Sequence, residues 1–247
     1  MNIFRMIGPG AWLITSLRFL SKFRNGIDHN RNIGDQVEER KQILNATSTW
    51  GPKLVEHFDV NLEVEGLENI PEGTVLFVAN HQGYSDIVAF CAAVKTKQFG
   101  FVAKQVLGKI PLYGPWILRI RSILIEREDA RGAVKVINEG IELLKNGYSL
   151  VVFPEGTRSL SDEMAHFKKG SLKLATKAEV PVVPVTLSGS WRVFEEKGYI
   201  QKGITVRFFA HPPIDTKGLT RIEGIELAEN VDAIIRNKLE EWNGNIQ

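Results

Sequence analysis

The feature that most constrains the fold is an alternation that begins near residue 60. From there on, short runs rich in β-branched residues alternate with stretches of helical periodicity. This alternation is typical of an α/β domain, so we expect a mixed, largely parallel sheet flanked by helices. The expected strands are residues 61–65, 74–79, 99–103, 123–125, 150–153, 182–187 and 204–209, and the expected helices are residues 87–95, 129–146, 170–178 and 222–242.

The first sixty residues follow a different pattern. Residues 11–23 fit a helix with apolar bulk beside basic side chains, and residues 36–58 fit a second helix with Gly51-Pro52 as a candidate break. The polar stretch DHNRNIGD, residues 28–35, is expected to be the turn between them. We therefore predict a two-helix membrane-associating segment, residues 1–60, followed by an α/β domain, residues 61–247.

The amino-terminal helix is the candidate membrane contact. The longest charge-free stretch in the first 24 residues, residues 6–17, has about 12 residues, whereas a helix that spans a bilayer needs about 20. No small-residue cleavage site follows clearly, so a secretory signal fits less well. Apolar and basic side chains together indicate a helix lying in the membrane interface, which predicts a peripheral or monotopic protein on the cytoplasmic face of the cell (inner) membrane. An amphipathic helix packed on the core is the alternative.

Composition argues against several classes of function. The net charge is only +2, and no Lys/Arg stripe with interleaved aromatic residues is present, so we expect no nucleic-acid partner. The one cysteine, Cys91, lies in the apolar run IVAFCAAV and is expected in the core. Neither a disulfide framework nor zinc or cysteine-nucleophile chemistry fits this usage, and we expect no metal site.

A histidine and an aspartate lie five positions apart in NHQGYSD, residues 80–86, directly after an expected strand. A regular helix or strand keeps such residues apart, whereas a tight turn at Gly83 brings them together. The carboxylate of Asp86 would then accept a hydrogen bond from one ring nitrogen of His81. The other ring nitrogen could take a proton as a general base. A structural His–Asp pair is the alternative.

A second polar turn, PEGTRS, follows the expected strand at residues 150–153. Gly156 allows close backbone approach, and the amides of Gly156 and Thr157 can face an anion. Arg158 supplies a planar fork suited to phosphate, and Glu155 is expected to orient that fork or to bind a substrate hydroxyl. The alternative is a plain turn with a surface ion pair.

Basic residues also follow two other expected strands. Lys104 comes after residues 99–103 and Arg127 after residues 123–125, so we expect both to join Arg158 in a small cationic pocket at one sheet edge. The apolar stretch at residues 110–120 is either core or the lining of a path for a lipid chain. Pro184, within an expected strand, indicates a sheet edge or a bulge.

Together these stretches resemble the glycerolipid acyltransferase family, over roughly residues 61–215. The family's N-H-x4-D block matches residues 80–86, its F-P-E-G-T-R-S block matches residues 153–159, and its V-P-x-x-P-V block matches residues 180–185. A further block departs from the family's pattern, because Arg121 and Leu124 stand where a glycine and a phenylalanine are usual. Ile125 and Arg127 agree with it.

The resemblance implies that His81 is the base acting on the acceptor hydroxyl and that Asp86 orients and charges it. The residues implied or expected to bind the acceptor's phosphate are Glu155, Gly156, Thr157 and Arg158, with Lys104 and Arg127 from the neighbouring strand ends. The implied donor is an acyl thioester of coenzyme A or acyl carrier protein, with no bound cofactor. The implied partners are lysophosphatidic acid and the phospholipid bilayer.

The expected reaction is acyl transfer to the sn-2 hydroxyl of 1-acyl-sn-glycerol-3-phosphate, which gives phosphatidic acid in phospholipid biosynthesis. Two alternatives remain open. The same His–Asp pair could serve a hydrolase of a lipid thioester or phosphoester, and the amino-terminal helices could belong to a non-catalytic membrane-binding module.

Overall fold

The computed structural model describes residues 16–126, 130–168 and 170–244. All the expected strands are present within two residues of their expected bounds. The strands are β1 (Asn61–Glu65), β2 (Leu76–Ala79), β3 (Phe99–Lys104), β4 (Ile123–Ile125), β5 (Ser149–Val152), β6 (Val182–Ser188) and β7 (Thr205–Ala210). The α-helices are α2 (Ser21–Ile33), α3 (Gln36–His57), α4 (Ser85–Ala93), α5 (Tyr113–Arg119), α6 (Ala130–Lys145), α7 (Lys173–Ala178) and α8 (Arg221–Gly244). Short 3-10 helices are η1 (Leu17–Leu20), η2 (Leu67–Asn69), η3 (Gln105–Lys109) and η4 (Ser190–Val193).

The described strands form one sheet in the order β1-β7-β6-β2-β5-β3-β4. Neighbouring strands run parallel except for β6 and β7, which are antiparallel. The expected mixed, largely parallel sheet is confirmed. Because β2, β3 and β5 are parallel neighbours, their carboxyl ends share one edge, which is where open α/β sheets place their sites.

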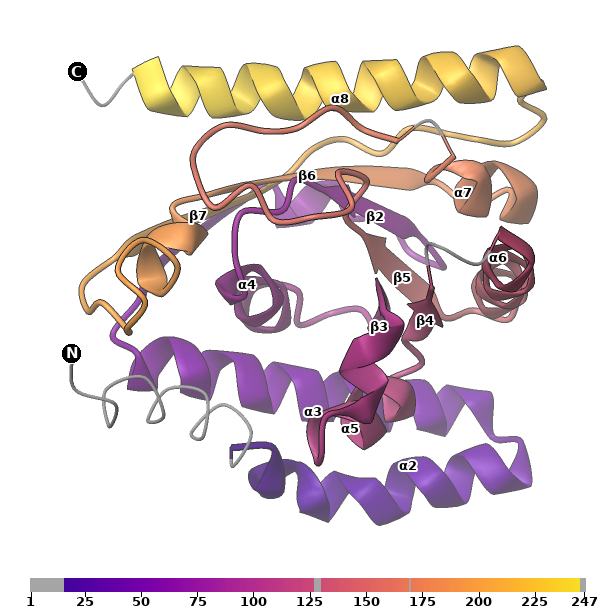
Figure 1. Ribbon diagram of the computed structural model, residues 1–247. Coiled ribbons are helices and arrows are strands. Elements are labelled where there is room, and N and C mark those ends of the chain that lie inside the picture. The colour runs from indigo at the N-terminus through magenta and orange to yellow at the C-terminus, as the bar shows by residue number, and fades with distance from the viewer. Residues whose placement is uncertain (1–15, 127–129, 169, 245–247) are drawn as a thin grey trace.

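Helices cover both faces of the sheet (Figure 1). On one face, α6, α7 and α8 bury an aliphatic core that includes Leu76 and Leu150. On the other face, α4 lies against the strands and α3 and α2 lie beyond it (Figure 1). The core on that side is rich in aromatic residues, with Phe77, Phe90 and Phe99 fully buried. The residues of α3 belong to this same core, so this helix is packed as part of the domain.

Two expectations for the amino-terminal helices need correction. The turn between the helices is present within residues 28–35, but it is confined to Gly34 and Asp35, because α2 continues to Ile33. Its polar residues stay helical since they find distant partners, as in the pair between Asp28 and Arg119. The expected break in α3 is also absent. Gly51 lets α3 touch α4, and a Cβ there would lie only 2.4 Å from the backbone nitrogen of Ala92.

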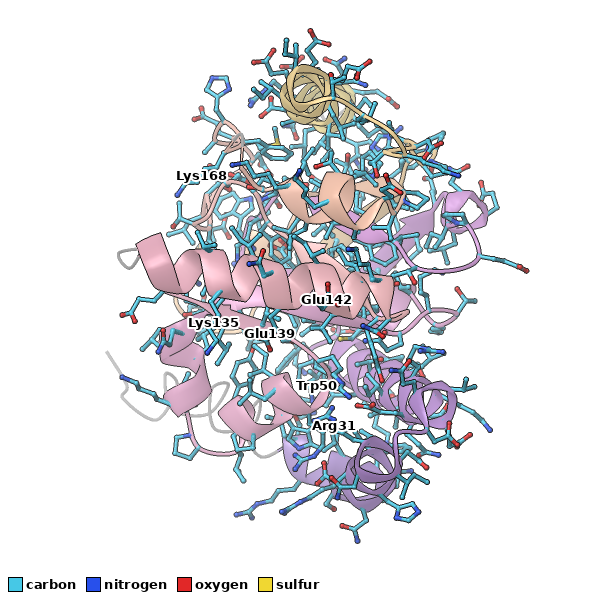
Figure 2. The ribbon with its side chains drawn as sticks, turned by 90° about the vertical axis from the view of Figure 1, so that its right-hand side faces the viewer. Arg31, Trp50, Lys135, Glu139, Glu142 and Lys168 are labelled. Carbon is cyan, nitrogen blue, oxygen red and sulfur yellow. The ribbon has the colours of Figure 1, made fainter. Side chains whose placement is uncertain are left out.

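A buried carboxylate joins the amino-terminal helices to the domain, and we call it with its partners the Glu39 cluster. Glu39 is 1% exposed. It accepts bonds of 2.8 Å from the guanidinium groups of Arg31 and Arg121 and one of 2.6 Å from the Tyr148 hydroxyl. Arg121 thus holds α3 through Glu39. This contact gives a structural reason for an arginine at a position where the family usually has glycine. Arg31 is labelled in Figure 2, below α6, whose exposed face carries Lys135, Glu139 and Glu142.

Pro184 does not lie on an edge strand, because β6 pairs with β2 on one side and β7 on the other. Proline lacks a backbone N–H, and this is tolerated because the regular pairing of β6 with the neighbouring chain is interrupted at Pro184. The ladder reaches Val185 and Ala210, and an isolated bridge then joins Val182 to Ile214. The carbonyl of Pro184 accepts a hydrogen bond from His211 N in this interval. The edge interpretation was therefore wrong, and the irregularity that proline requires is supplied by the neighbouring chain.

The stretch at residues 110–120 contains α5, which was not expected. Trp116 and Ile117 are buried, whereas Leu112 and Leu118 are exposed. In the part of the chain that the structure describes, no helix combines the length and apolar character needed to cross a bilayer. Much of the expected membrane contact, residues 1–15, lies outside the described residues. Within residues 16–24, Leu17 and Leu20 pack into the core, as the alternative interpretation expected.

Candidate active site

The two polar turns predicted from the sequence leave adjacent strands, β2 and β5, whose register pairs Val78 with Val152. Asn80 extends the sheet beyond the end of β2. Its side chain donates to Leu187 O and accepts from Leu187 N, both at 2.8 Å. An asparagine amide can form both bonds because it carries the donor and the acceptor of a peptide group. The first turn is thereby anchored to β6 directly before His81.

His81 and Asp86 are in direct contact, as the spacing predicted. Nδ1 of His81 lies 2.6 Å from Oδ2 of Asp86, and the same oxygen accepts from the amides of Gln82 and Gly83 at 2.8 and 3.0 Å. Oδ1 of Asp86 accepts a hydrogen bond from the Ser190 hydroxyl. Asp86 is fully buried in the first turn of α4, where the helix dipole favours a negative charge.

These contacts define the chemistry available to His81. With Nδ1–H donated to the carboxylate, Nε2 carries the lone pair and can accept a proton. The imidazole stacks on Phe153, with ring centroids 4.1 Å apart, and its side chain is 19% exposed. The ring is therefore fixed by a carboxylate and an aromatic neighbour while part of it remains accessible. This is the arrangement of an oriented general base.

Glu155 ties the second turn to the first. Its Oε1 accepts from His81 N at 2.6 Å and its Oε2 from Ala165 N at 2.9 Å. Two backbone bonds complete the connection, from Ser159 N to His81 O at 2.8 Å and from Leu160 N to Gln82 O at 3.1 Å. Burial raises the pKa of the Glu155 carboxyl to about 7, against the opposing effect of the two amides.

Arg158 is held by a different carboxylate from the one the sequence suggested. Its Nη1 donates to Oε1 of Glu195 at 2.9 Å, so the expected orientation of the fork by Glu155 is not what the structure shows. The guanidinium lies over the Tyr84 ring, 3.7 Å from the centroid. With its side chain 29% exposed, Arg158 presents a partly open cation beside the His81 turn.

The other expected phosphate ligands are placed as follows. Gly156 has φ 78°, a conformation that favours glycine, and its amide donates to Phe153 O at 3.1 Å within the turn. Thr157 is exposed, and so is Lys104 at the end of β3. Arg127 lies outside the described residues. The phosphate-binding roles of these residues, and of Glu155, remain predictions.

Two residues of this site were missed by sequence reasoning, Ser190 and Glu195. Both come from the chain that follows β6, which lies beside β2 in the sheet. The segment SGSWRVFEE carries no local pattern that points to the site, and Glu195 resembles an exposed acidic residue in it. Only knowledge that β6 neighbours β2 could have suggested that this segment reaches the NHQGYSD turn.

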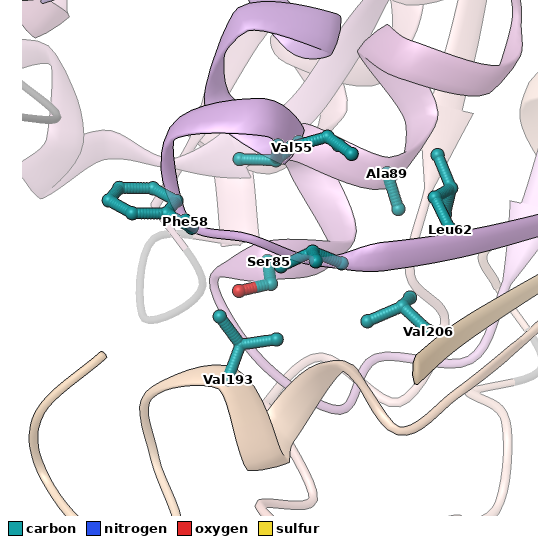
Figure 3. A pocket seen from close by; sticks show the side chains of 9 residues that line it. Val55, Phe58, Leu62, Ser85, Ala89, Val193 and Val206 are labelled. Atoms are coloured by element: carbon teal, nitrogen blue, oxygen red, sulfur yellow. The ribbon is translucent and has the colours of Figure 1, made fainter. Parts of the chain in front are cut away.

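A small apolar pocket lies between the end of α3, the start of α4 and strands β1 and β7 (Figure 3). Its lining includes Val55, Phe58, Leu62 and Val206, and Ser85 is the one polar residue among the side chains that line it. It does not involve residues 110–120, the stretch expected to line a lipid path. Across the described ranges, no group of His, Cys, Asp and Glu side chains is arranged to hold a metal ion.

Comparison with known proteins places this geometry in a family. The family model described as acyltransferase matches residues 61–188, and the chain belongs to the acyltransferase family. The resemblance drawn from the sequence blocks is therefore confirmed.

The curated relatives carry more specific names. The probable 1-acyl-sn-glycerol-3-phosphate acyltransferase of Mycoplasma pneumoniae is 32% identical over 184 residues, which cover 70% of this chain and 68% of the relative. A chloroplastic 1-acyl-sn-glycerol-3-phosphate acyltransferase of Arabidopsis thaliana is 36% identical over 158 residues, or 62% of this chain and 43% of the relative. The chain thus spans less than half the length of that chloroplast relative.

A solved structure agrees with the observed fold. The crystal structure of the 1-acyl-sn-glycerophosphate (LPA) acyltransferase from Thermotoga maritima superimposes with a TM-score of 0.75 at 32% identity. The match covers 94% of this chain and 95% of the other, so the similarity extends over the amino-terminal helices as well as the sheet.

Proposed function

We propose that this protein is a 1-acyl-sn-glycerol-3-phosphate acyltransferase of phospholipid biosynthesis. It would transfer an acyl chain from a thioester of coenzyme A or acyl carrier protein to the sn-2 hydroxyl of lysophosphatidic acid, giving phosphatidic acid and a free thiol. The observation that carries the proposal is the hydrogen-bonded joining of the two turns, one of which bears the His81–Asp86 pair and the other the Arg158 guanidinium. The names of the relatives supply the substrate class.

The chemical step follows from the His81–Asp86 pair. Nε2 of His81 takes the proton of the acceptor hydroxyl as the hydroxyl oxygen attacks the thioester carbonyl. Asp86 stabilises the imidazolium that forms, and the proton then passes to the departing thiolate. We propose a ternary complex without an acyl-enzyme, because the sequence shows no serine, cysteine or lysine in a nucleophile motif.

Arg158 is the proposed ligand of the acceptor's phosphate, since its fork is planar and partly open toward solvent. Lys104, Thr157 and Arg127 are proposed to add positive charge or hydrogen bonds at the same sheet edge. The bilayer is the proposed site of action because the acceptor is a lipid. Peripheral attachment on the cytoplasmic face is supported by the basic residues exposed at the start of α2, Lys22 and Arg24.

The test is product analysis with the purified protein. Lysophosphatidic acid and a labelled acyl thioester, offered in turn as coenzyme A and carrier-protein forms, should give labelled phosphatidic acid with at least one donor. His81→Ala should lose 10²–10⁴-fold in rate, on the order expected for a general base. Free fatty acid formed at the same rate with and without acceptor would identify a hydrolase instead. Vesicle binding without any product would identify a membrane-binding module.

A further inference from the structure

Glu195 reaches the site from the chain that follows η4, far in sequence from the residues it contacts. Its side chain is 5% exposed. Oε1 accepts from Arg158 Nη1 at 2.9 Å and from the backbone N of Tyr84 at 2.7 Å. One carboxylate oxygen therefore bridges the second turn and the residue that precedes α4, within the His81 turn.

The glycine of the NHQGYSD turn leaves room for this carboxylate. A Cβ built on Gly83 would lie 2.6 Å from Oε2 of Glu195, which is closer than real Cβ contacts come. Gly83 is not among the described glycines with positive φ, so backbone conformation is not the reason for a glycine here. The space beside Gly83 is occupied by the group that holds Arg158.

Arg158 is thus restrained from two sides. Glu195 holds Nη1, and the Tyr84 ring supports the plane of the guanidinium. Such a restraint lowers the conformational entropy that a long side chain would otherwise lose when a ligand binds. The fork has five N–H donors, and its bond to Glu195 uses one; within the described residues, the donors of Nε and Nη2 are left for a second, bidentate partner.

We propose that Glu195 is a positioning residue, which holds Arg158 in the orientation that receives the phosphate of the acceptor. This inference rests on the proposed function, in which Arg158 is the phosphate ligand. Glu195 would act through Arg158 and not on the substrate directly. Its removal should weaken acceptor binding while the base and the thioester site continue to work.

The test compares steady-state kinetics of wild type and Glu195→Gln, which keeps the size and an acceptor for Tyr84 N but loses the charge. We expect KM for lysophosphatidic acid to rise roughly tenfold, the loss typical of one charge-assisted hydrogen bond. KM for the thioester and kcat should change by less than about twofold. Glu196→Gln, an exposed neighbour, is the matched control and should behave as wild type.

A double-variant cycle shows whether Glu195 acts through Arg158. In an Arg158→Ala background, Glu195→Gln should have no further effect on the acceptor KM. A persistent effect there would overturn the inference, as would an unchanged acceptor KM in the single variant. A lowered acceptor KM would also overturn it and show that Glu195 blocks Arg158 until substrate binds.

The cycle also separates this inference from the proposed function. If Arg158→Ala leaves the acceptor KM unchanged, the phosphate assignment itself fails. If Arg158→Ala raises it and Glu195→Gln does not, only the positioning role fails. Glu195→Asp, which keeps the charge but shortens the reach, is the second variant, and it should reproduce the direction of the KM change while thermal unfolding confirms a folded protein.

Discussion

Glu39 and Glu155 are both buried carboxylates, 1% and 4% exposed, yet they have opposite surroundings. Glu39 is surrounded by Arg31, Arg121 and Tyr148, and their hydrogen bonds hold its pKa below the usual range despite burial. Glu155 accepts hydrogen bonds from two backbone amides, and burial raises its pKa to about 7. The first carboxylate joins α2 and α3 to the domain, and the second joins the two turns of the candidate site.

The difference separates a junction, where guanidinium groups and a hydroxyl surround the carboxylate, from a site whose cation stays partly open to solvent. In the Glu39 cluster, both carboxylate oxygens already accept two hydrogen bonds each, which leaves them little to offer a ligand. At the sheet edge, Arg158 meets one carboxylate through a single nitrogen and stays partly exposed. Strongly perturbed pKa values such as that of Glu155 gather at functional sites. Variants at the two places should therefore fail in different ways.

The largest effect should come from Asp86→Asn. Its Oδ2 accepts from two backbone amides and faces Nδ1 of His81, so an amide there cannot stabilise an imidazolium and favours the wrong tautomer. We expect kcat to fall roughly 10²–10⁴-fold, measured with both substrates saturating and corrected for the folded fraction. Wild-type turnover over the whole pH range would refute the role of the pair.

Glu39→Gln should show the reverse behaviour, a loss of stability without a loss of chemistry. Removing the charge deprives Arg31 and Arg121, which are 28% and 27% exposed, of their carboxylate, and hydrogen bonds to charged groups are worth about 1.5–3 kcal/mol each. Denaturant unfolding measures this loss, and kcat per folded molecule should stay at the wild-type value. Glu142→Gln, which removes an exposed pair with Lys145 at 4.0 Å, is the control and should hardly matter. A selective loss of kcat in Glu39→Gln would break the comparison.

The two carboxylates should also give opposite dependences of stability on pH. The pKa of Glu39 is lowered on folding, so its contribution is present above about pH 4.5 and is lost as pH falls. The pKa of Glu155 is raised from 4.5 to about 7, so the folded state binds more protons between these values and loses stability as pH rises.

Unfolding free energies of wild type, Glu39→Gln and Glu155→Gln, measured from about pH 2.5 to 8, test this pair of signs, because the Glu39 effect lies below pH 4.5 and the Glu155 effect above it. Relative to Glu155→Gln, wild type should lose up to about 3 kcal/mol as pH rises through that window. Parallel pH profiles for the two variants would show that the carboxylates do not differ as their contacts indicate.

The smallest effect is expected for Ser190→Ala. The hydroxyl donates to Oδ1 of Asp86, so its loss leaves one oxygen of the carboxylate without that donor. One such bond is worth about 1 kcal/mol, which predicts a roughly fivefold fall in kcat. Substrate KM values should stay unchanged, because Ser190 acts on the base and not on the phosphate site. A change in acceptor KM alone would place Ser190 with Arg158 instead.

Local pattern was sufficient for the strands and for the His81–Asp86 contact, because strand periodicity and a five-residue turn are properties of adjacent residues. It failed where the partner is distant. The length of α2 depends on pairs such as Asp28 with Arg119, and the placement of Glu195 depends on β6 lying beside β2. Pro184 predicted an edge or a bulge, and the sequence could not choose between them, since pairing partners and the gaps between them are not visible in one strand.

The backbone bonds from Ser159 and Leu160 to the carbonyls of His81 and Gln82 extend the sheet's pairing past its own edge. Through them, the backbones that carry His81 and Arg158 are hydrogen-bonded to each other directly. In the proposed reaction, these backbone bonds would set the distance between the group that binds the acceptor's phosphate and the group that receives the proton of its hydroxyl. The enzyme would then select acceptors by the number of carbons between phosphate and hydroxyl, and the backbone connection between the two turns would contribute to that selectivity.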